Sequence, residues 1–188
     1  VVYPQLQFNV SLSGRMIDLV EEGVDLALRI GTTGSQHVVA KPIGYTHLLA
    51  VASPTYLASA PPLNTPDDLA NHHCLVYEHH LTDQHIWKFV DKTNNPHEVR
   101  ISGDFYSDNS NFLTELAANG LGISCAPCFV VMPYLEAGKV VKVLPDYQTA
   151  ASVIYAVYPH RKHLSAKVRL FIRFFEQWLQ EHDAAHNI

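Results

Sequence analysis

The stretch LQFNVSLSGRMIDLVEEGVDLALRI, residues Leu6–Ile30, decides the fold class. Its first part, Leu6–Leu12, alternates apolar and polar side chains, which predicts a strand. Ser13-Gly14 predicts a turn, and apolar residues at helical spacing then predict a short helix over Met16–Glu22. A glycine ends that helix, and Asp25–Ile30 is a second predicted strand. Strand, helix and strand in this order build parallel sheets, so we expect an α/β fold.

The rest of the chain continues to alternate strands and helices, without an internal repeat. Further strands are predicted at Leu48–Ala52, Cys74–Tyr77, Trp87–Val90, Val99–Ser102, Leu121–Cys125, Val140–Leu144 and Val153–Val157. Helices are predicted after Ser53, Thr65, Ser107–Ser110, Pro127 and Ser165. A polar cap or a proline opens each of these helices. The pattern therefore predicts two α/β lobes.

Composition restricts the function. The 188 residues carry a net charge of −5, and the thirteen Lys and Arg residues are scattered along the chain. Duplex binding needs clustered cations, so we expect no DNA binding by this chain itself. No apolar run approaches the roughly 20 residues of a membrane span. With no signal-peptide pattern, we expect a cytoplasmic location, although the chain opens without an initiator Met and is expected to be a fragment.

Four segments together resemble one family, the effector-binding domain of LysR-type transcriptional regulators. They are Asp18–Gly31, Val51–Leu57, Ala118–Pro127 and Ile154–Arg169. They occur in the order and spacing of the family and together cover nearly the whole chain. The resemblance implies a two-lobed, periplasmic-binding-protein-like fold with mixed sheets. The first lobe would comprise residues 1–52 and 158–188, and the second lobe residues 53–157.

The resemblance also implies a function without chemistry. A small effector, an organic or aromatic acid by family habit, would bind between the lobes and shift an equilibrium that a DNA-binding domain reads out. The family's N-terminal winged helix-turn-helix is absent from this chain, and so are the strand and helix that precede the first matching segment. Self-association as a dimer or tetramer is also implied, with Phe8, Val10, Met16 and Val20 as candidates for that surface or, alternatively, as core residues.

Effector contacts are expected where strands end and helices begin. Ligands of such sheets bind beyond the carboxyl ends of the strands, where helix N-termini favour anions. Three such turns are Ser13-Gly14, Ser107-Asp108-Asn109 and Pro127-Cys128-Phe129. The family places these turns on its cleft. Alternatively, the polar residues of the first two turns only cap their helices.

The end of the second strand offers a further candidate contact. Arg29 could hold an effector carboxylate in a bidentate fork, beside Gly31 and Thr32. Strand alternation equally allows Arg29 to point to the surface.

Two clusters have chemistry that the resemblance does not need. Cys125 and Cys128 have the C-x-x-C spacing of redox dithiols, but the first cysteine belongs to a strand, so we expect core or cleft wall rather than a catalytic or redox-sensing pair. The histidines His72, His73, His79, His80 and His85 fit no standard zinc spacing, so we expect no metal and no cofactor.

Two other classes of protein remain open. A stand-alone solute-binding protein of the transport type would have the same fold, so the fold does not decide between them. A thiol oxidoreductase would have to use Cys125 and Cys128. We find no paired carboxylates, Ser-His-Asp set or phosphate loop, and we therefore expect no enzyme.

Overall fold

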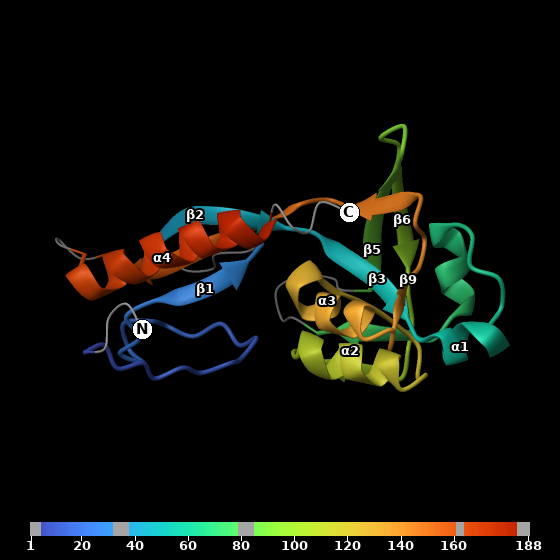
Figure 1. Cartoon of the computed structure of the whole chain (residues 1–188), viewed down its shortest axis with the longest axis horizontal. Coiled ribbons are helices and arrows are strands. Elements are labelled where there is room, and N and C mark those ends of the chain that lie inside the picture. Colours follow the sequence, from blue (N-terminus) through green and yellow to red (C-terminus); the bar gives the residue numbers. More distant parts are fainter. Residues whose placement is uncertain (1–4, 32–37, 79–84, 161–163, 184–188) are drawn as a thin grey trace. The chain divides into compact units, whose positions relative to one another are not determined.

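The computed structural model describes residues 5–31, 38–78, 85–160 and 164–183 and divides the chain into two compact units (Figure 1). One unit comprises Val1–Tyr45 with Ser152–Ile188, and the other comprises Thr46–Ala151. The chain therefore passes from one unit to the other between Tyr45 and Thr46 and again between Ala151 and Ser152. β3 (Leu48–Ala52) pairs within the second unit and β11 (Ser152–Pro159) within the first, so the crossings lie a few residues before the lobe boundaries expected from sequence.

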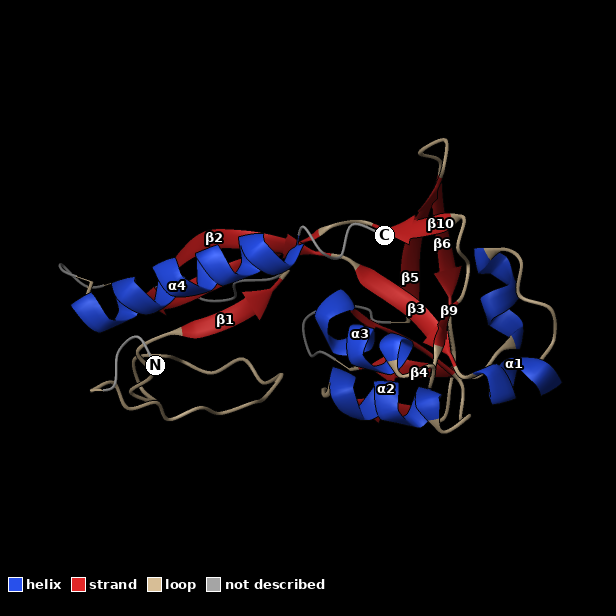
Figure 2. Cartoon of the chain, viewed as in Figure 1, coloured by secondary structure: helices blue, strands red, loops and turns tan. Residues whose placement is uncertain are grey.

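The first unit is a three-stranded sheet with a helix on one face (Figure 2). The strand order is β1 (Ala27–Ile30), β11, β2 (Val38–Thr46), and β1 runs antiparallel to β11. The helix is α4 (Ala166–Asp183), which the sequence predicts from Ser165. Its apolar face packs on the sheet. Val168 and Ile172 of α4 form a core there with Ile43, Ile154 and Ala156 of the strands.

The sequence prediction for residues 6–22 is wrong. Leu6–Leu12 forms no strand, Met16–Glu22 forms no helix, and the parallel strand–helix–strand unit is not built. Only one turn occurs, in which Asp18 Oδ1 accepts the N–H groups of Val20 and Glu21. Alternation makes a strand only where a neighbouring strand takes its hydrogen bonds. A segment as short as Met16–Glu22 also needs packing to become helical, and of its side chains only Leu19 is buried.

The second unit is built on a five-stranded mixed sheet. The order is β7 (Phe105–Ser107), β4 (Cys74–Tyr77), β8 (Ile123–Pro127), β3, β9 (Val141–Lys142). β4 runs parallel to β7 and β8, while β3 runs antiparallel to β8 and β9. A second, antiparallel sheet has the order β10 (Tyr147–Thr149), β5 (Ile86–Asp91), β6 (Pro96–Arg100).

Helices cover the five-stranded sheet. α2 (Ser110–Ala118) packs on Leu75, and α3 (Cys128–Glu136) packs on Val51 and Ala126. Because side chains alternate along a strand, Ala50, Cys74 and Ile123 point to the opposite face. There they form the largest core with residues of β5 and β6, beside α1 (Pro54–Ser59) and the 3₁₀ helix η1 (Pro66–Asn71).

Most of the other predicted elements are confirmed, with small shifts at their ends. Ser53 caps α1 by accepting the N–H of Tyr56 at 3.1 Å, as Ser53-Pro54 predicts. The strand predicted at Val99–Ser102 lies earlier, as β6, and the strand predicted at Val140–Leu144 is shorter, as β9. The sequence prediction missed β2, β7 and β10.

Candidate functional site

The candidate site of the second unit lies at the end of the five-stranded sheet where its parallel strands finish. We call this end the candidate edge; it is distinct from the edge strands β7 and β9. Because β4, β7 and β8 are parallel, their last residues Tyr77, Ser107 and Pro127 lie at the same edge. Leu48, the first residue of β3, pairs with Pro127 and reaches that edge too. Both α2 and α3 begin there, so two helix N-termini face one side of this sheet.

Asn109 caps α2. Its Oδ1 accepts the N–H of Phe112 at 3.0 Å, and its own N–H donates to Ser107 Oγ at 3.1 Å. The capping alternative therefore holds for Asn109, while Asp108 is exposed and takes no part in the cap. Side-chain capping satisfies one of the free N–H groups of a helix start and leaves others, here those of Ser110 and Asn111, available to a ligand.

The start of α3 has no side-chain cap. Its N-cap residue is Pro127, and the N–H of Cys128 donates to the carbonyl of His47 at 2.9 Å. His47 Nδ1 lies 3.3 Å from the Thr149 carbonyl oxygen, which ties this turn to β10. The N–H groups of the next two residues of the helix keep the partial positive charge of a helix N-terminus.

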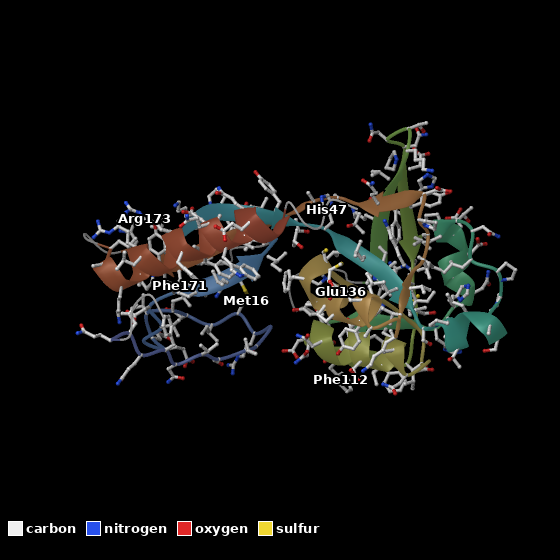
Figure 3. All side chains as sticks on the ribbon, viewed as in Figure 1. Met16, His47, Phe112, Glu136, Phe171 and Arg173 are labelled. Atoms are coloured by element: carbon white, nitrogen blue, oxygen red, sulfur yellow. The ribbon has the colours of Figure 1, made fainter. Side chains whose placement is uncertain are left out.

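Aromatic side chains stand exposed on the first turns of both helices. Phe112 is 50% and Phe129 47% exposed. Figure 3 shows Phe112 on α2 and His47 just before β3. The edge therefore combines N–H donors with apolar surface, which suits a small anion with an apolar body.

One group at this edge disfavours anions. Asp108 places a carboxyl group beside the helix starts and close to Tyr77. Burial is the main cause that raises the pKa of the Tyr77 phenol, and the charge of Asp108 adds to it. An anionic ligand has to approach the helix starts rather than the Asp108 side chain.

The predicted residues of the first unit have other contacts. Ser13 Oγ accepts the N–H of Arg15 at 3.1 Å, and because no helix follows, Ser13 is no helix cap. Arg29 donates from Nη2 to the Ile17 carbonyl at 3.3 Å, and burial lowers the pKa of its guanidinium. The half-buried Gly14 lies beside Ser13.

Gly31 adopts a left-handed φ of 81° and donates its N–H to the Val153 carbonyl at 2.9 Å. Thr32 lies outside the described residues. The structure therefore gathers Ser107, Asp108, Asn109, Pro127, Cys128 and Phe129 at one edge of the second unit. Ser13, Gly14, Arg29 and Gly31 belong to the first unit.

The residues predicted for self-association are largely exposed. Phe8, Val10 and Val20 are 63%, 71% and 58% exposed, and Met16 is half-buried. The ring of Phe8 lies 5.8 Å from that of Phe171 on α4, centre to centre (Figure 3 labels Phe171 and Met16). These side chains present apolar surface on the first unit.

The two cysteines of the C-x-x-C motif lie in different elements. Cys125 lies in β8, opposite Ala50, while Cys128 is the first residue of α3. Burial raises the pKa of the Cys125 thiol to about 12, and the same cause raises the pKa of Cys74 to about 12. A reactive cysteine needs a low pKa, so this environment disfavours Cys125 as a nucleophile. All three cysteines are free thiols.

The described histidines have separate contacts. His72 is buried and lies 3.1 Å from the Tyr56 hydroxyl, His73 faces Asp104 at 3.9 Å, and the ring of His85 contacts Tyr106. His79, His80 and His163 lie outside the described residues. Within the described ranges, no three His, Cys, Asp or Glu side chains gather as metal ligands do. No helix in those ranges has the length and apolar character to cross a membrane.

Sequence reasoning missed two residues of the candidate edge, His47 and Tyr77. Tyr77 is the last residue of a predicted buried strand, and that position was the available signal. His47 gave no signal, because its carbonyl and not its side chain fixes the start of α3.

Comparisons with known proteins agree on one family. Residues 2–180 match the family described as the LysR substrate binding domain. An uncharacterized HTH-type transcriptional regulator of Haemophilus influenzae is 36% identical over 166 residues, which are 88% of this chain and 57% of that protein. The HTH-type transcriptional activator TtdR of Escherichia coli is 32% identical over 179 residues, which are 95% of this chain and 57% of the activator.

Solved structures give the same result. The full-length structure of the Vibrio cholerae virulence activator AphB, a member of the LTTR protein family, matches with a TM-score of 0.76 at 28% identity. The match covers 94% of this chain and 59% of AphB. The chain therefore spans somewhat more than half the length of these relatives.

Proposed function

This chain belongs to the LysR substrate binding domain family, and from that premise we propose that it senses a small anionic effector on behalf of a transcriptional regulator. Its fold is the two-lobed, periplasmic-binding-protein-like α/β fold of the regulatory domains in that family, as expected. The relatives named above are transcriptional regulators. We therefore propose a sensing role without catalysis, in the cytoplasm, with DNA contacted by a separate domain of the whole protein.

One observation carries the proposal. α2 and α3 both begin at the same edge of the five-stranded sheet, and neither start is fully capped by side chains. Free N–H groups at two helix starts bind a carboxylate through hydrogen bonds and dipoles without needing a cation. Phe112 and Phe129 add exposed apolar surface beside them. An organic or aromatic acid is the ligand class that matches both features.

The experiment is thermal unfolding of the chain against a panel of aliphatic and aromatic acids, each with its neutral amide. A ligand that binds only the folded state adds about 2.7 kcal/mol at 100 times its Kd, which gives a clear rise in Tm. One acid class is expected to raise the Tm and its amide is not. If no acid of the panel raises the Tm, or the amides do so equally, the proposal is wrong.

A single substitution locates the effect. Ser110→Pro removes one donor N–H at the first position of α2, where proline is well tolerated. Asn109, which precedes it, has φ −119° and ψ 103°, an extended conformation that a following proline accepts. The variant is expected to keep the Tm of the unliganded chain and to lose most of the acid-induced rise. Asn111→Ala, which keeps every backbone N–H, is the matched control.

We also propose that four apolar residues of the first unit, the exposed Phe8, Val10 and Val20 and the half-buried Met16, take part in self-association. Most of the surface of Val10 is exposed, so Val10→Lys is expected to cost little stability. Sedimentation equilibrium of wild type and variant tests this role. A wild-type assembly that the lysine leaves unchanged would remove Val10 from the interface.

A further inference from the structure

A groove lies beside the edge strand β9, away from the candidate edge described above. It has a volume of about 370 Å³. One wall runs from Leu57 in α1 to Leu63 beyond the helix, and the other wall runs from Lys142 in β9 to Pro145. Small-molecule pockets start at about 300 Å³, so one ring or a short branched chain fits this volume.

Most residues of the two walls are apolar. Leu57 and Leu63 supply half-buried aliphatic side chains, and Val143 and Leu144 line the groove from the large core, in which they are buried. Three prolines, Pro61, Pro62 and Pro145, contribute no N–H donor. Leu144 is buried and has φ 53°, a left-handed conformation that a non-glycine residue holds only when its surroundings enforce it. The packing of the large core thus holds the chain in the turn that shapes this wall.

Lys142 is the single cation of the groove. Among the described residues its ammonium has no ion pair or hydrogen bond, whereas Lys139 lies over the ring of Tyr134 at 5.9 Å. Within the described part of the chain, no Asp or Glu lines the groove, and Asp146, which follows Pro145, is already paired with Lys92 at 2.5 Å. An apolar groove with one unopposed positive charge is complementary to an apolar body that carries one negative charge.

The backbone of Lys142 adds a second donor. The N–H of Val143 donates to the Ala50 carbonyl at 2.9 Å, and Lys142 pairs with Val51. In an antiparallel ladder the residues alternate, so the N–H of Lys142 points outward from β3, toward the free edge of the sheet. A carboxylate beside β9 could therefore accept from this N–H and from the ammonium together.

We propose that this groove is a separate binding site for a small monocarboxylate with an apolar body of one ring or one short branched chain. The proposal does not rest on the effector site. The groove flanks the end of β3 near Val51, while the helix starts of α2 and α3 lie at the Leu48 end of that strand.

The test is a ¹H–¹⁵N NMR titration of the chain with phenylacetate and, separately, with phenylacetamide at millimolar concentration. Saturable shifts are expected at the amides of Leu57, Lys142 and Val143 with the acid. Lys142→Gln keeps most of the aliphatic stem and removes the charge, and it is expected to weaken phenylacetate binding about tenfold. Lys139→Gln, on the same segment but outside the groove, is expected to leave the Kd unchanged.

Three results would overturn the proposal. The first is the absence of any saturable shift at the groove. The second is a set of shifts confined to the first turns of α2 and α3, which would place the acid at the effector site alone. The third is equal binding of acid and amide, with Lys142→Gln matching wild type. Leu63→Ala, which removes apolar wall and leaves the charge, is a second variant and is expected to weaken the acid and the amide alike.

Discussion

The hydroxyl of Tyr56 lies 3.1 Å from Nδ1 of the buried His72 and also accepts the backbone N–H of His73 at 3.1 Å. One side chain of α1 thereby satisfies two polar groups at the start of β4. The other ring nitrogen of His72, Nε2, is buried and has no hydrogen-bond partner among the described residues. The pairing ties the short α1 helix to the sheet and leaves the imidazole dependent on a single partner.

Tyr56→Phe removes that hydroxyl and keeps the ring. It leaves the buried imidazole without a partner, so we expect a loss of about 1–3 kcal/mol in the free energy of unfolding. Urea denaturation followed by circular dichroism measures it. Tyr106→Phe, at an exposed tyrosine of the same unit, is the control and is expected to cost less than about 0.5 kcal/mol. Equal stability of the two variants would show that the hydroxyl of Tyr56 contributes nothing.

Gly103 faces the backbone of β4 too closely for any side chain. A Cβ there would overlap the carbonyl oxygen of Cys74, in the segment where the N–H of Cys74 donates to Ser102. Gly103→Ala must therefore shift a buried backbone, and we expect a loss of more than about 3 kcal/mol. Gly138→Ala meets no atom within 4 Å and carries only the cost of its left-handed φ of 66°, about 1 kcal/mol. Urea midpoints that fall equally in both variants would contradict the overlap.

Local signals predicted the elements whose ends are fixed by their own residues. Ser53 before Pro54 and Asn109 before α2 cap the helices that the sequence predicts there. Such caps depend on hydrogen bonds across three residues, so a local pattern contains them. The turn at Ser107 was found for the same reason, whereas the turn at Pro127 was found from the proline that marks a helix start; together they form most of the candidate edge.

Signals that depend on distant partners failed. Leu6–Leu12 has the alternation of a strand, but strand formation depends on a neighbouring edge that no local pattern specifies. The pairing of Tyr56 with His72 and the groove beside Lys142 join segments far apart in the chain. The order of strands in the sheet decides these contacts, and the sequence pattern leaves that order open.

Asp91 gives the hairpin of β5 and β6 a dependence on pH. Hydrogen bonds from the side chains of Thr93 and Asn95 hold the pKa of the Asp91 carboxyl well below its ordinary value. A depressed pKa contributes stability above the unfolded pKa, about 4, and this contribution is lost as the pH falls toward the folded value. We expect wild type to lose stability on acidification more steeply than Asp91→Asn. Urea midpoints at about pH 5 and about pH 3 measure the two slopes. Thr93→Val, which removes the largest contribution, is expected to fall between them, and parallel slopes would contradict the assignment.

Cys74 and Cys125 should resist alkylation in the folded chain. Burial raises the pKa of each thiol to about 12, so almost no thiolate is present near neutral pH. We expect iodoacetamide to modify both at least about a hundredfold more slowly in buffer than in urea. Mass spectrometry of tryptic peptides measures each site separately. Rapid modification of Cys125 in the folded chain would support the hypothesis that Cys125 and Cys128 act as a redox pair.

Asn109 separates a capping role from a ligand role. Asn109→Asp keeps an oxygen that accepts the Phe112 N–H, and a negative charge at a helix start is favourable, so we expect unchanged or slightly higher stability. Asn109→Ala loses the cap and is expected to cost about 1 kcal/mol.

An acid that stabilises wild type should raise the Tm of Asn109→Ala more than that of Asn109→Asp, although Asn109→Asp is the more stable variant without ligand. A carboxylate at position 109, beside Asp108, repels an anion from the start of α2, so Asn109→Asp should lose the ligand-induced rise in Tm although it folds well. Asn109→Ala should keep much of that rise from a lower starting Tm. If Asn109→Asp kept the full rise, the acid would have to bind elsewhere on the chain. The starts of α2 and α3 would then have no role in binding the ligand.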